Sequence, residues 1–174
     1  MNKKLIVFAL GFLWLVVAIG VVMSKQYILR TGLPVVLETV PVDPRDFLRG
    51  DYVILSYKIS ALDLNQIVSK KTDYRRGEDI FVELTQRGKF WEAVAIHEKR
   101  DITKGMVCIK GRVKYCYSKR LSLIYGIESY FVPEGEGREL ERSMRGNKSS
   151  VSVEAVVDSS GNAMIKRVYI DKAE

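Results

Sequence analysis

The chain has 174 residues and carries 28 lysines and arginines against 21 aspartates and glutamates, which gives a formal net charge of +7 at pH 7. A single histidine and two cysteines fall short of the four ligands of a typical structural zinc site, and we expect no metal and no cofactor. No basic stripe is interleaved with stacking aromatic residues, so we expect no nucleic-acid partner.

The chain begins with a segment that is predicted to span a membrane. After Lys3 and Lys4, nineteen residues from Leu5 to Met23 contain no charged side chain. As a helix they extend about 28 Å, close to the ~30 Å hydrocarbon core of a bilayer. The alternative is a signal peptide cleaved around residues 22–24, but the apolar core of such peptides usually has only about 7–15 residues. We therefore expect the segment to be retained as an anchor.

The basic residues around the anchor predict its orientation. Lys3 and Lys4 hold the N-terminus in the cytoplasm under the positive-inside rule, although Lys25 and Arg30 on the other side weaken this bias. All acidic residues and 26 of the 28 basic residues follow Ser24, an excess of five positive charges that we interpret as an ordinary solvated surface.

The predicted organisation has three parts. Residues 1–24 form the cytoplasmic N-terminus and the transmembrane anchor, residues 25–33 form a connector, and residues 34–174 form an exported β domain. About 140 residues are enough for one domain with its own core.

The first part of the exported domain is predicted to be strands. Residues 34–42 are rich in β-branched side chains, which fit a pleated surface. Residues 52–59 alternate, and one of their two faces is wholly apolar or aromatic. We expect that face to meet the core: Val53, Leu55, Tyr57 and Ile59.

The rest of the chain is also read as mainly β. The predicted elements are a short helix at 61–68, a charged loop at 70–79, a hairpin of 80–85 and 90–97, a strand region at 106–117 interrupted by Gly111, a β run at 121–132, a loop entering a short helix at 134–144, and a final hairpin of 151–157 and 163–170. The sum predicts an antiparallel barrel or a strongly bent sheet with one or two short helices, because closure removes edges that would otherwise aggregate.

The two cysteines, Cys108 and Cys116, are eight residues apart. On one continuous strand they lie on the same face but ~26 Å apart, far beyond bridging distance. Only a turn between them, at Gly111, would allow a disulfide. We expect buried free thiols instead.

The most informative segment is 44–57, in which Gly50-Asp51-Tyr52, Leu55 and Tyr57 read GDYxxLxY. It resembles the signature of the GDYXXLXY family of bacterial membrane-anchored proteins. The stretch 125–137 is similar to the second block of that family, and 151–170 fits its closing strands.

The resemblance implies a location and a class of partner, but no reaction. Members of the family have no established activity, and they often occur beside or joined to multi-pass membrane domains. We therefore expect a single-span protein of the bacterial cytoplasmic membrane, with its C-terminal domain outside the cytoplasm, that binds or assembles with an integral membrane protein.

Two candidate functional regions follow from these motifs. The first region contains five charged residues within a stretch of nine positions. They form either a salt-bridged turn, which we favour, or a hydrolytic pair or hard-cation site. The first region consists of Asp43, Arg45, Asp46, Arg49, Gly50, Asp51, Tyr52, Leu55 and Tyr57. The second consists of Tyr130, Glu134, Gly135, Glu136 and Gly137.

Catalysis is not the favoured interpretation. The enzymatic alternative is a hydrolase related to membrane signal peptidases, because Pro44 and the Gly50-Asp51 pair resemble their layout, but no serine stands in that turn. A Ser–Lys pair would also require a desolvated lysine beside a serine. A third alternative is a small-ligand module with Tyr52, Tyr130 and Phe131 at a barrel mouth. His97 is expected to be structural or to face solvent.

Overall fold

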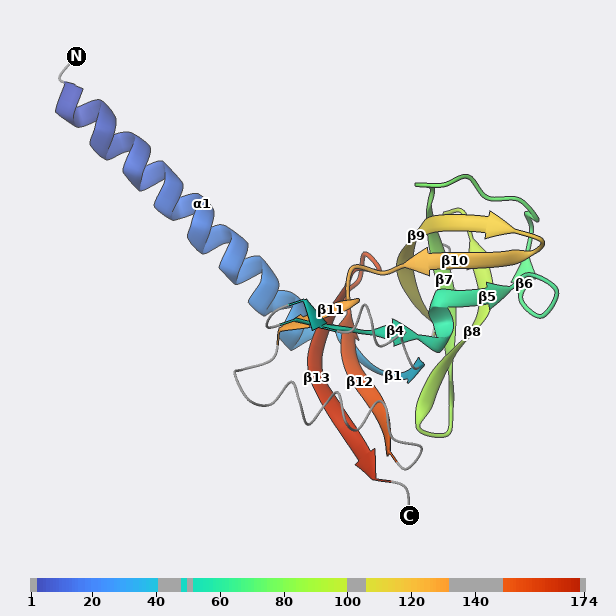
Figure 1. The fold of residues 1–174 in the computed structure, drawn as a ribbon. Helices are drawn as coiled ribbons and strands as arrows, with labels where there is room; N and C mark the ends of the chain where they lie inside the picture. Colours follow the sequence, from blue (N-terminus) through green and yellow to red (C-terminus); the bar gives the residue numbers. More distant parts are fainter. Residues whose placement is uncertain (1–2, 41–47, 50–51, 100–105, 132–148, 173–174) are drawn as a thin grey trace.

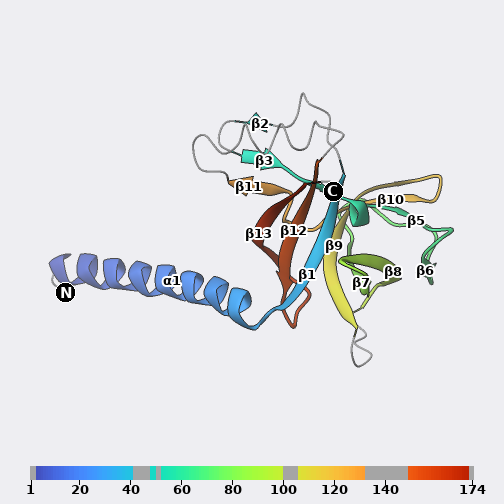
Figure 2. The same cartoon turned by 90° about the horizontal axis from the view of Figure 1, so that it is seen from below.

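The computed structural model describes residues 3–40, 48–49, 52–99, 106–131 and 149–172. The helix expected within 134–144 lies outside these residues. The described chain is mainly β and has one long apolar helix at its N-terminus, as the sequence predicts. In both views this helix projects away from the β part (Figures 1 and 2).

The helix α1 spans Lys3–Thr31, and its residues 5–23 carry no charge on any face. Its stretch Ile6–Thr31 is long and apolar enough to cross a membrane, and none of its most apolar window is buried against the rest of the chain. The predicted connector is therefore largely helical, since α1 continues through residues 25–31. The Gly32 N–H then donates to the Ile28 carbonyl (2.8 Å), and the first strand begins at Leu33.

The strands form three sheets (Figure 1). Among the described residues, all strand pairs are antiparallel except β6 with β8. The strands are β1 (Leu33–Val40), β2 (Leu48–Arg49), β3 (Tyr52–Ile54), β4 (Ser56–Tyr57), β5 (Ala61–Asp63), β6 (Val68–Ser69), β7 (Asp79–Arg87), β8 (Phe90–His97), β9 (Val107–Tyr117), β10 (Arg120–Ile124), β11 (Ser129–Phe131), β12 (Ser149–Val157) and β13 (Ala163–Lys172).

The largest sheet has the order β5-β10-β9-β7-β8-β6, the second β13-β12-β1-β4 and the smallest β11-β3-β2. Register shifts interrupt three of the hairpin pairs: β7 with β8, β9 with β10, and β12 with β13. A bulge bends the strand that carries it and increases the local twist. The bulges therefore account for a curled sheet, the bent form that the sequence predicts.

The turn that joins β12 to β13 forms one of the contacts between the two larger sheets. The Gly161 carbonyl in this turn accepts a hydrogen bond from the Lys110 N–H of β9 (2.7 Å). The Asp158 carboxylate holds the turn by accepting from the backbone N–H groups of Ser160 and Asn162. Buried side chains from both sheets form one core, so the sheets belong to a single packed unit.

The predicted short helix at 61–68 is wrong. Residues 61–63 form β5, in which Leu62 pairs with Leu121 and is buried. A turn follows, because the Asp63 side chain accepts hydrogen bonds from both the backbone and the side chain of Asn65. Such local side-chain bonds compete with helix formation. A single 3₁₀ turn, η1 (Lys58–Ser60), comes before β5 instead.

Two predicted β regions also change. The strand region at 106–117 is the continuous β9, which Gly111 does not interrupt, and Cys108 and Cys116 are not joined by a disulfide. Glycine is needed at 111 because a Cβ there would lie 3.0 Å from the Tyr125 ring. The β run at 121–132 is divided into β10 and β11 by a turn. The hairpins of β7 with β8 and of β12 with β13 are confirmed.

Replacement of Gly161 tests the contact between the larger sheets. Its φ is +85°, and a Cβ would lie 3.1 Å from the Cys108 carbonyl oxygen and 3.3 Å from the Lys110 nitrogen. We expect Gly161→Ala to lower the free energy of unfolding by more than the ~1–2 kcal/mol of a left-handed non-glycine residue. Chemical denaturation of the full-length protein in detergent micelles, followed by circular dichroism, measures the loss.

Gly88 provides the matched control. Its φ is +61°, but a Cβ at this position would have no heavy atom within 4 Å. Gly88→Ala should therefore show only the backbone cost. Equal losses for the two variants would mean that the close approach at Gly161 does not hold the sheets together.

Candidate functional site

The signature strand presents its apolar face to the core, as its alternation predicts. Val53, Leu55, Tyr57 and Ile59 have relative exposures of 0%, 1%, 0% and 4%. The chain reaches this arrangement through two short strands, β3 and β4, and the 3₁₀ turn η1, rather than through one uninterrupted strand. Leu55 lies between β3 and β4, and its N–H donates to the Glu128 carbonyl (2.7 Å).

Two buried tyrosine hydroxyls join the two signature blocks. Tyr57 of the first block donates to the Ile127 carbonyl of the second (2.5 Å). Tyr125 of the second block donates to the Ile59 carbonyl, just beyond the first (2.6 Å). Burial, with a smaller effect of the Glu128 carboxylate, raises the pKa of both hydroxyls above their usual value. They therefore remain neutral donors, which is a structural role.

The turn between β10 and β11 is shaped by Glu128. Its carboxylate accepts hydrogen bonds from the N–H of Tyr125 (2.5 Å) and the N–H of Gly126 (2.9 Å). Gly126 has a φ of +80°, which only glycine adopts readily. Ile127 follows and is buried, so the turn inserts an apolar side chain into the core beside Tyr57.

The same two blocks pair again as the small sheet. In the β3–β11 register, Tyr52 is opposite Phe131 and Val53 is opposite Tyr130. On the other side of β3, Arg49 of β2 is opposite Tyr52. The predicted residues Tyr52, Tyr130 and Phe131 are thus brought together on neighbouring strands. Tyr130 is half-buried, whereas Phe131 is 57% exposed.

Several predicted site residues lie outside the described part of the chain. In the first region these are Asp43, Arg45, Asp46, Gly50 and Asp51, and in the second Glu134, Gly135, Glu136 and Gly137. The salt-bridged turn and the hydrolytic or cation site therefore remain predictions. Among the residues that are described, Leu55 and Tyr57 serve the core, and Arg49 and Tyr52 are placed by backbone pairing in the small sheet.

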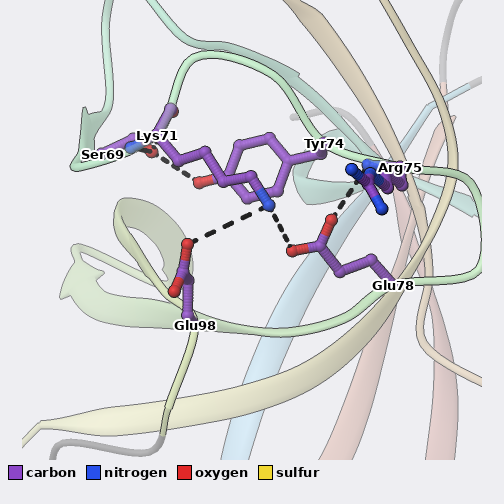
Figure 3. Close-up of polar contacts among 6 residues, drawn as sticks. All are labelled: Ser69, Lys71, Tyr74, Arg75, Glu78 and Glu98. Carbon is purple, nitrogen blue, oxygen red and sulfur yellow. Dashed lines mark hydrogen bonds and ion pairs between the residues drawn. The ribbon is translucent and has the colours of Figure 1, made fainter.

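A second polar cluster, which sequence reasoning did not single out, gathers after β6 (Figure 3). The Ser69 hydroxyl lies 2.6 Å from the Tyr74 hydroxyl and donates to the Lys71 carbonyl (2.7 Å). The Lys71 ammonium donates to Glu78 (2.7 Å) and lies 4.0 Å from Glu98. The short spacing of Ser69, Lys71 and Tyr74 was the available sequence signal.

This cluster brings a serine near a lysine but does not activate it. The hydrogen bond to Glu78 raises the pKa of the Lys71 ammonium, whereas a lysine acting as a base must lose its proton. The Ser69 oxygen is already engaged by Tyr74, by the Lys71 carbonyl and by the Lys71 N–H (3.2 Å). The geometry is that of a loop held in place by hydrogen bonds and ion pairs, and it gives no support to a hydrolase.

A third charged group lies next to α1. The Asp79 carboxylate accepts a hydrogen bond from Arg112 Nε (2.8 Å) and lies 2.9 Å from Lys110 Nζ. These two bonds, Arg112 first, lower the pKa of the Asp79 carboxyl to about 2. Lys110 and Arg112 flank Gly111 on β9, so one carboxylate gathers two cations at the same edge of the domain.

The other chemically versatile residues are accounted for by structure. The His97 side chain hydrogen-bonds Glu83 across β8 and β7, with 2.7 Å between Nε2 and Oε2. Cys108 is buried and Cys116 half-buried, and neither forms a disulfide. Within the described ranges, no group of three or more histidine, cysteine and acidic residues is placed to hold a metal ion.

One comparison with known proteins finds a match. The sequence model of the family described as GDYXXLXY protein matches residues 14–168, which is most of the chain and includes both signature blocks. No curated protein and no solved structure matches the chain.

Removal of the Tyr57 hydroxyl tests the link between the blocks. Tyr57→Phe keeps the ring and leaves the buried Ile127 carbonyl without its donor. We expect a loss of about 1–3 kcal/mol in the free energy of unfolding. Tyr57→Ala should cost about 3–5 kcal/mol, because it also removes the buried ring. Tyr117→Phe is the control, since Tyr117 is 80% exposed. If the denaturation curves of Tyr117→Phe and Tyr57→Phe coincide, the structural role of the Tyr57 hydroxyl is refuted.

The charge cluster at Asp79 predicts a pH dependence. Because the pKa of the Asp79 carboxyl is about 2 in the folded state and ordinarily 3.8, the stability contributed by Asp79 is complete above about pH 5 and is lost as the pH falls toward 2. Asp79→Asn should therefore have a lower melting temperature than the parent protein at neutral pH, and the difference between the two melting temperatures should be smaller at pH 2. High salt should also narrow it, because these ion pairs are exposed.

Asp73→Asn is the matched control for this measurement. Asp73 is exposed and forms no ion pair with the described residues, so its variant should follow the parent at every pH. A gap between Asp79→Asn and the parent that stays constant from pH 7 to pH 2 would show that the carboxylate charge does not stabilise the fold.

Proposed function

The chain belongs to the GDYXXLXY family, and from this premise we propose that it is a bacterial protein anchored in the cytoplasmic membrane by α1, whose β domain lies outside the cytoplasm and assembles with an integral membrane protein. In this proposal residues 1–24 hold the N-terminus and the anchor, and the domain from residue 34 onward contacts the partner. In this role the protein places a protein surface at the membrane.

The exposure of α1 supports the anchor. Its three large aromatic side chains within the apolar run, Phe8, Phe12 and Trp14, are 69–79% exposed. An apolar helix that the rest of the chain does not cover needs another apolar environment, and a bilayer provides one. Lys3 and Lys4 before the apolar run favour the orientation with the N-terminus in the cytoplasm.

The junction between anchor and domain supports a role at the membrane surface. Only Gly32 separates the end of α1 from the start of β1. A Cβ at Gly32 would lie 2.7 Å from the Ile28 carbonyl oxygen and 3.1 Å from Cβ of Val156, so the strands close tightly on the helix end. A domain held so close to the bilayer is restricted to partners that are themselves at the membrane.

The observation that carries the proposal is the position of the small sheet. In both views β3 and β11 lie on the α1 side of the β domain, whereas the tip joining β9 to β10 lies on the far side (Figures 1 and 2). Figure 2 shows them displaced sideways from the helix end itself, where β1 begins and the turn between β12 and β13 lies. The two signature blocks thus meet on the α1 side of the domain, where they present Phe131. Exposed aromatic side chains are frequent anchors of protein–protein interfaces.

Site-specific photo-crosslinking in intact membranes tests this function. A photoreactive amino acid at Phe131 is expected to give an adduct with an integral membrane protein, identified by mass spectrometry. The same amino acid at Tyr117, which is 80% exposed at the end of β9 and far from α1, should not give that adduct. Identical adducts from both positions, or none from Phe131, would refute the proposed contact surface.

The topology needs its own measurement. A reporter that is active only outside the cytoplasm, fused after Glu174, should be active. The mature protein should also begin at or near Met1, because the anchor is retained in this proposal. An inactive reporter reverses the orientation, and an N-terminus near Lys25 replaces the anchor by a cleaved signal peptide.

A further inference from the structure

A cavity of about 530 Å³ lies where α1 meets the β domain. The helix contributes Lys25 and Ile28 to its wall. The rest of the described lining comes from the start of β7, the central part of β9, the end of β10 with the turn that follows it, and the turn between β12 and β13 with the start of β13. Residues that matter for its chemistry are Lys25, Asp79, Lys110, Arg112, Asn162 and Ile124.

The cavity lies at the depth of the lipid headgroups if α1 spans the bilayer. The apolar run ends at Met23, and Lys25 follows two residues later. At about 1.5 Å of rise per residue, Lys25 lies only ~3 Å beyond the hydrocarbon core along the helix axis. A wall formed by Lys25 and Ile28 must therefore open into the interfacial layer, where phospholipid phosphates lie.

The charges on the wall favour an anion. Among the described residues that line the cavity, three carry cationic side chains, Lys25, Lys110 and Arg112, and one carries a carboxylate, Asp79. Asp79 engages Nε and one terminal nitrogen of Arg112, the latter at 3.4 Å, so other guanidinium N–H groups are left for a ligand. The side chain of Arg112 is 64% exposed. Lys25 has no ion-pair partner within the described ranges.

The remaining lining suits the rest of a lipid headgroup. Ile28, Ile124 and Met164 offer apolar surface beside the cations, and Asn162 adds an amide. Ile124, the last residue of β10, is 41% exposed, whereas Leu121 and Leu123 of the same strand are buried. A phosphate with a glycerol ester attached combines the same two properties, a fixed negative charge and adjoining carbon atoms.

We propose that this cavity binds the headgroup phosphate of an anionic phospholipid in the membrane that α1 spans. The proposal rests on the proposed function in one respect, namely that α1 is a retained span. Arg112, oriented by Asp79, contacts the phosphate from the β domain, and Lys25 contacts it from the helix. The lipid thereby connects the anchor to the domain.

Native mass spectrometry of the full-length protein in an uncharged detergent tests the site. The probes are short-chain phosphatidylglycerol, short-chain phosphatidylcholine and inorganic phosphate. We expect one phosphatidylglycerol to bind at least about tenfold more tightly than phosphatidylcholine. A basic residue near an anionic membrane surface contributes about fivefold in affinity, so Lys25→Gln should weaken binding by about that factor and Lys25→Gln with Arg112→Gln by about thirtyfold.

A charge-matched control is available on the same strand and its turn. Lys114 and Lys119 are exposed and do not line the cavity, so replacing both by glutamine should leave binding unchanged. If the variant with both Lys25→Gln and Arg112→Gln has a lower melting temperature than the parent, the binding of Lys25→Gln alone is compared with that of the parent. Lys25 lies on α1 outside the β core.

Three outcomes would overturn the proposal. One is equal affinity of the parent for the two phospholipids, and another is unchanged binding in both cavity variants. The third is inorganic phosphate binding as tightly as phosphatidylglycerol, which would make the cavity a site for a soluble anion.

The assay does not depend on orientation or on a partner protein. An inactive reporter at Glu174 together with selective lipid binding would refute the proposed topology and leave the lipid site standing. An active reporter without selective binding would refute the lipid site alone.

Discussion

The fold depends on two buried hydrogen bonds that run in opposite directions between the signature blocks. Tyr57 donates to the backbone of the second block, and Tyr125 donates to the backbone that follows the first. Each ring lies in the core, and each hydroxyl satisfies a carbonyl that would otherwise be buried without a donor. A buried carbonyl that loses its donor costs the desolvation of that group, so neither tyrosine is readily exchanged for phenylalanine.

These bonds position elements beyond the core. Because Tyr57 and Tyr125 hold the β10–β11 turn against β4 and η1, the strand that follows the turn is delivered beside β3. The same turn passes the cavity next to α1, to which it contributes Ile124, Tyr125 and Gly126. The internal tyrosine contacts thus determine both the small sheet and one wall of the cavity, although neither tyrosine has to touch a partner.

The parts of the structure that depend on hydrophobic periodicity and on turn-forming residues could be predicted from the sequence. Alternation over 52–59 identified the buried face, and Gly88 and Gly161 marked two hairpin turns that the structure contains. The prediction of a helix at 61–68 was wrong, because the Asp63 side chain accepts hydrogen bonds from Asn65 and stabilises a turn instead. The β9–β10 turn was equally hard to predict, because Ser118 and Lys119 both adopt positive φ without the glycine or asparagine that is typical of such turns.

For the candidate site, the roles of Leu55 and Tyr57 could be predicted, whereas the pairing of Asp79 with Lys110 and Arg112 could not. Residues distant in sequence meet only through strand register.

The cavity beside α1 also bears on how the anchor is oriented. Its wall needs Lys25 and Ile28 of the helix together with β9, so it exists only while the helix keeps its place against the domain. A ligand that binds this arrangement and no other stabilises it, by an amount that grows with the concentration of the ligand relative to its dissociation constant. An anionic bilayer supplies such a ligand at high local concentration. Membrane composition would then decide how firmly the domain is held over its anchor, and with it how steadily the small sheet is presented to a neighbouring membrane protein.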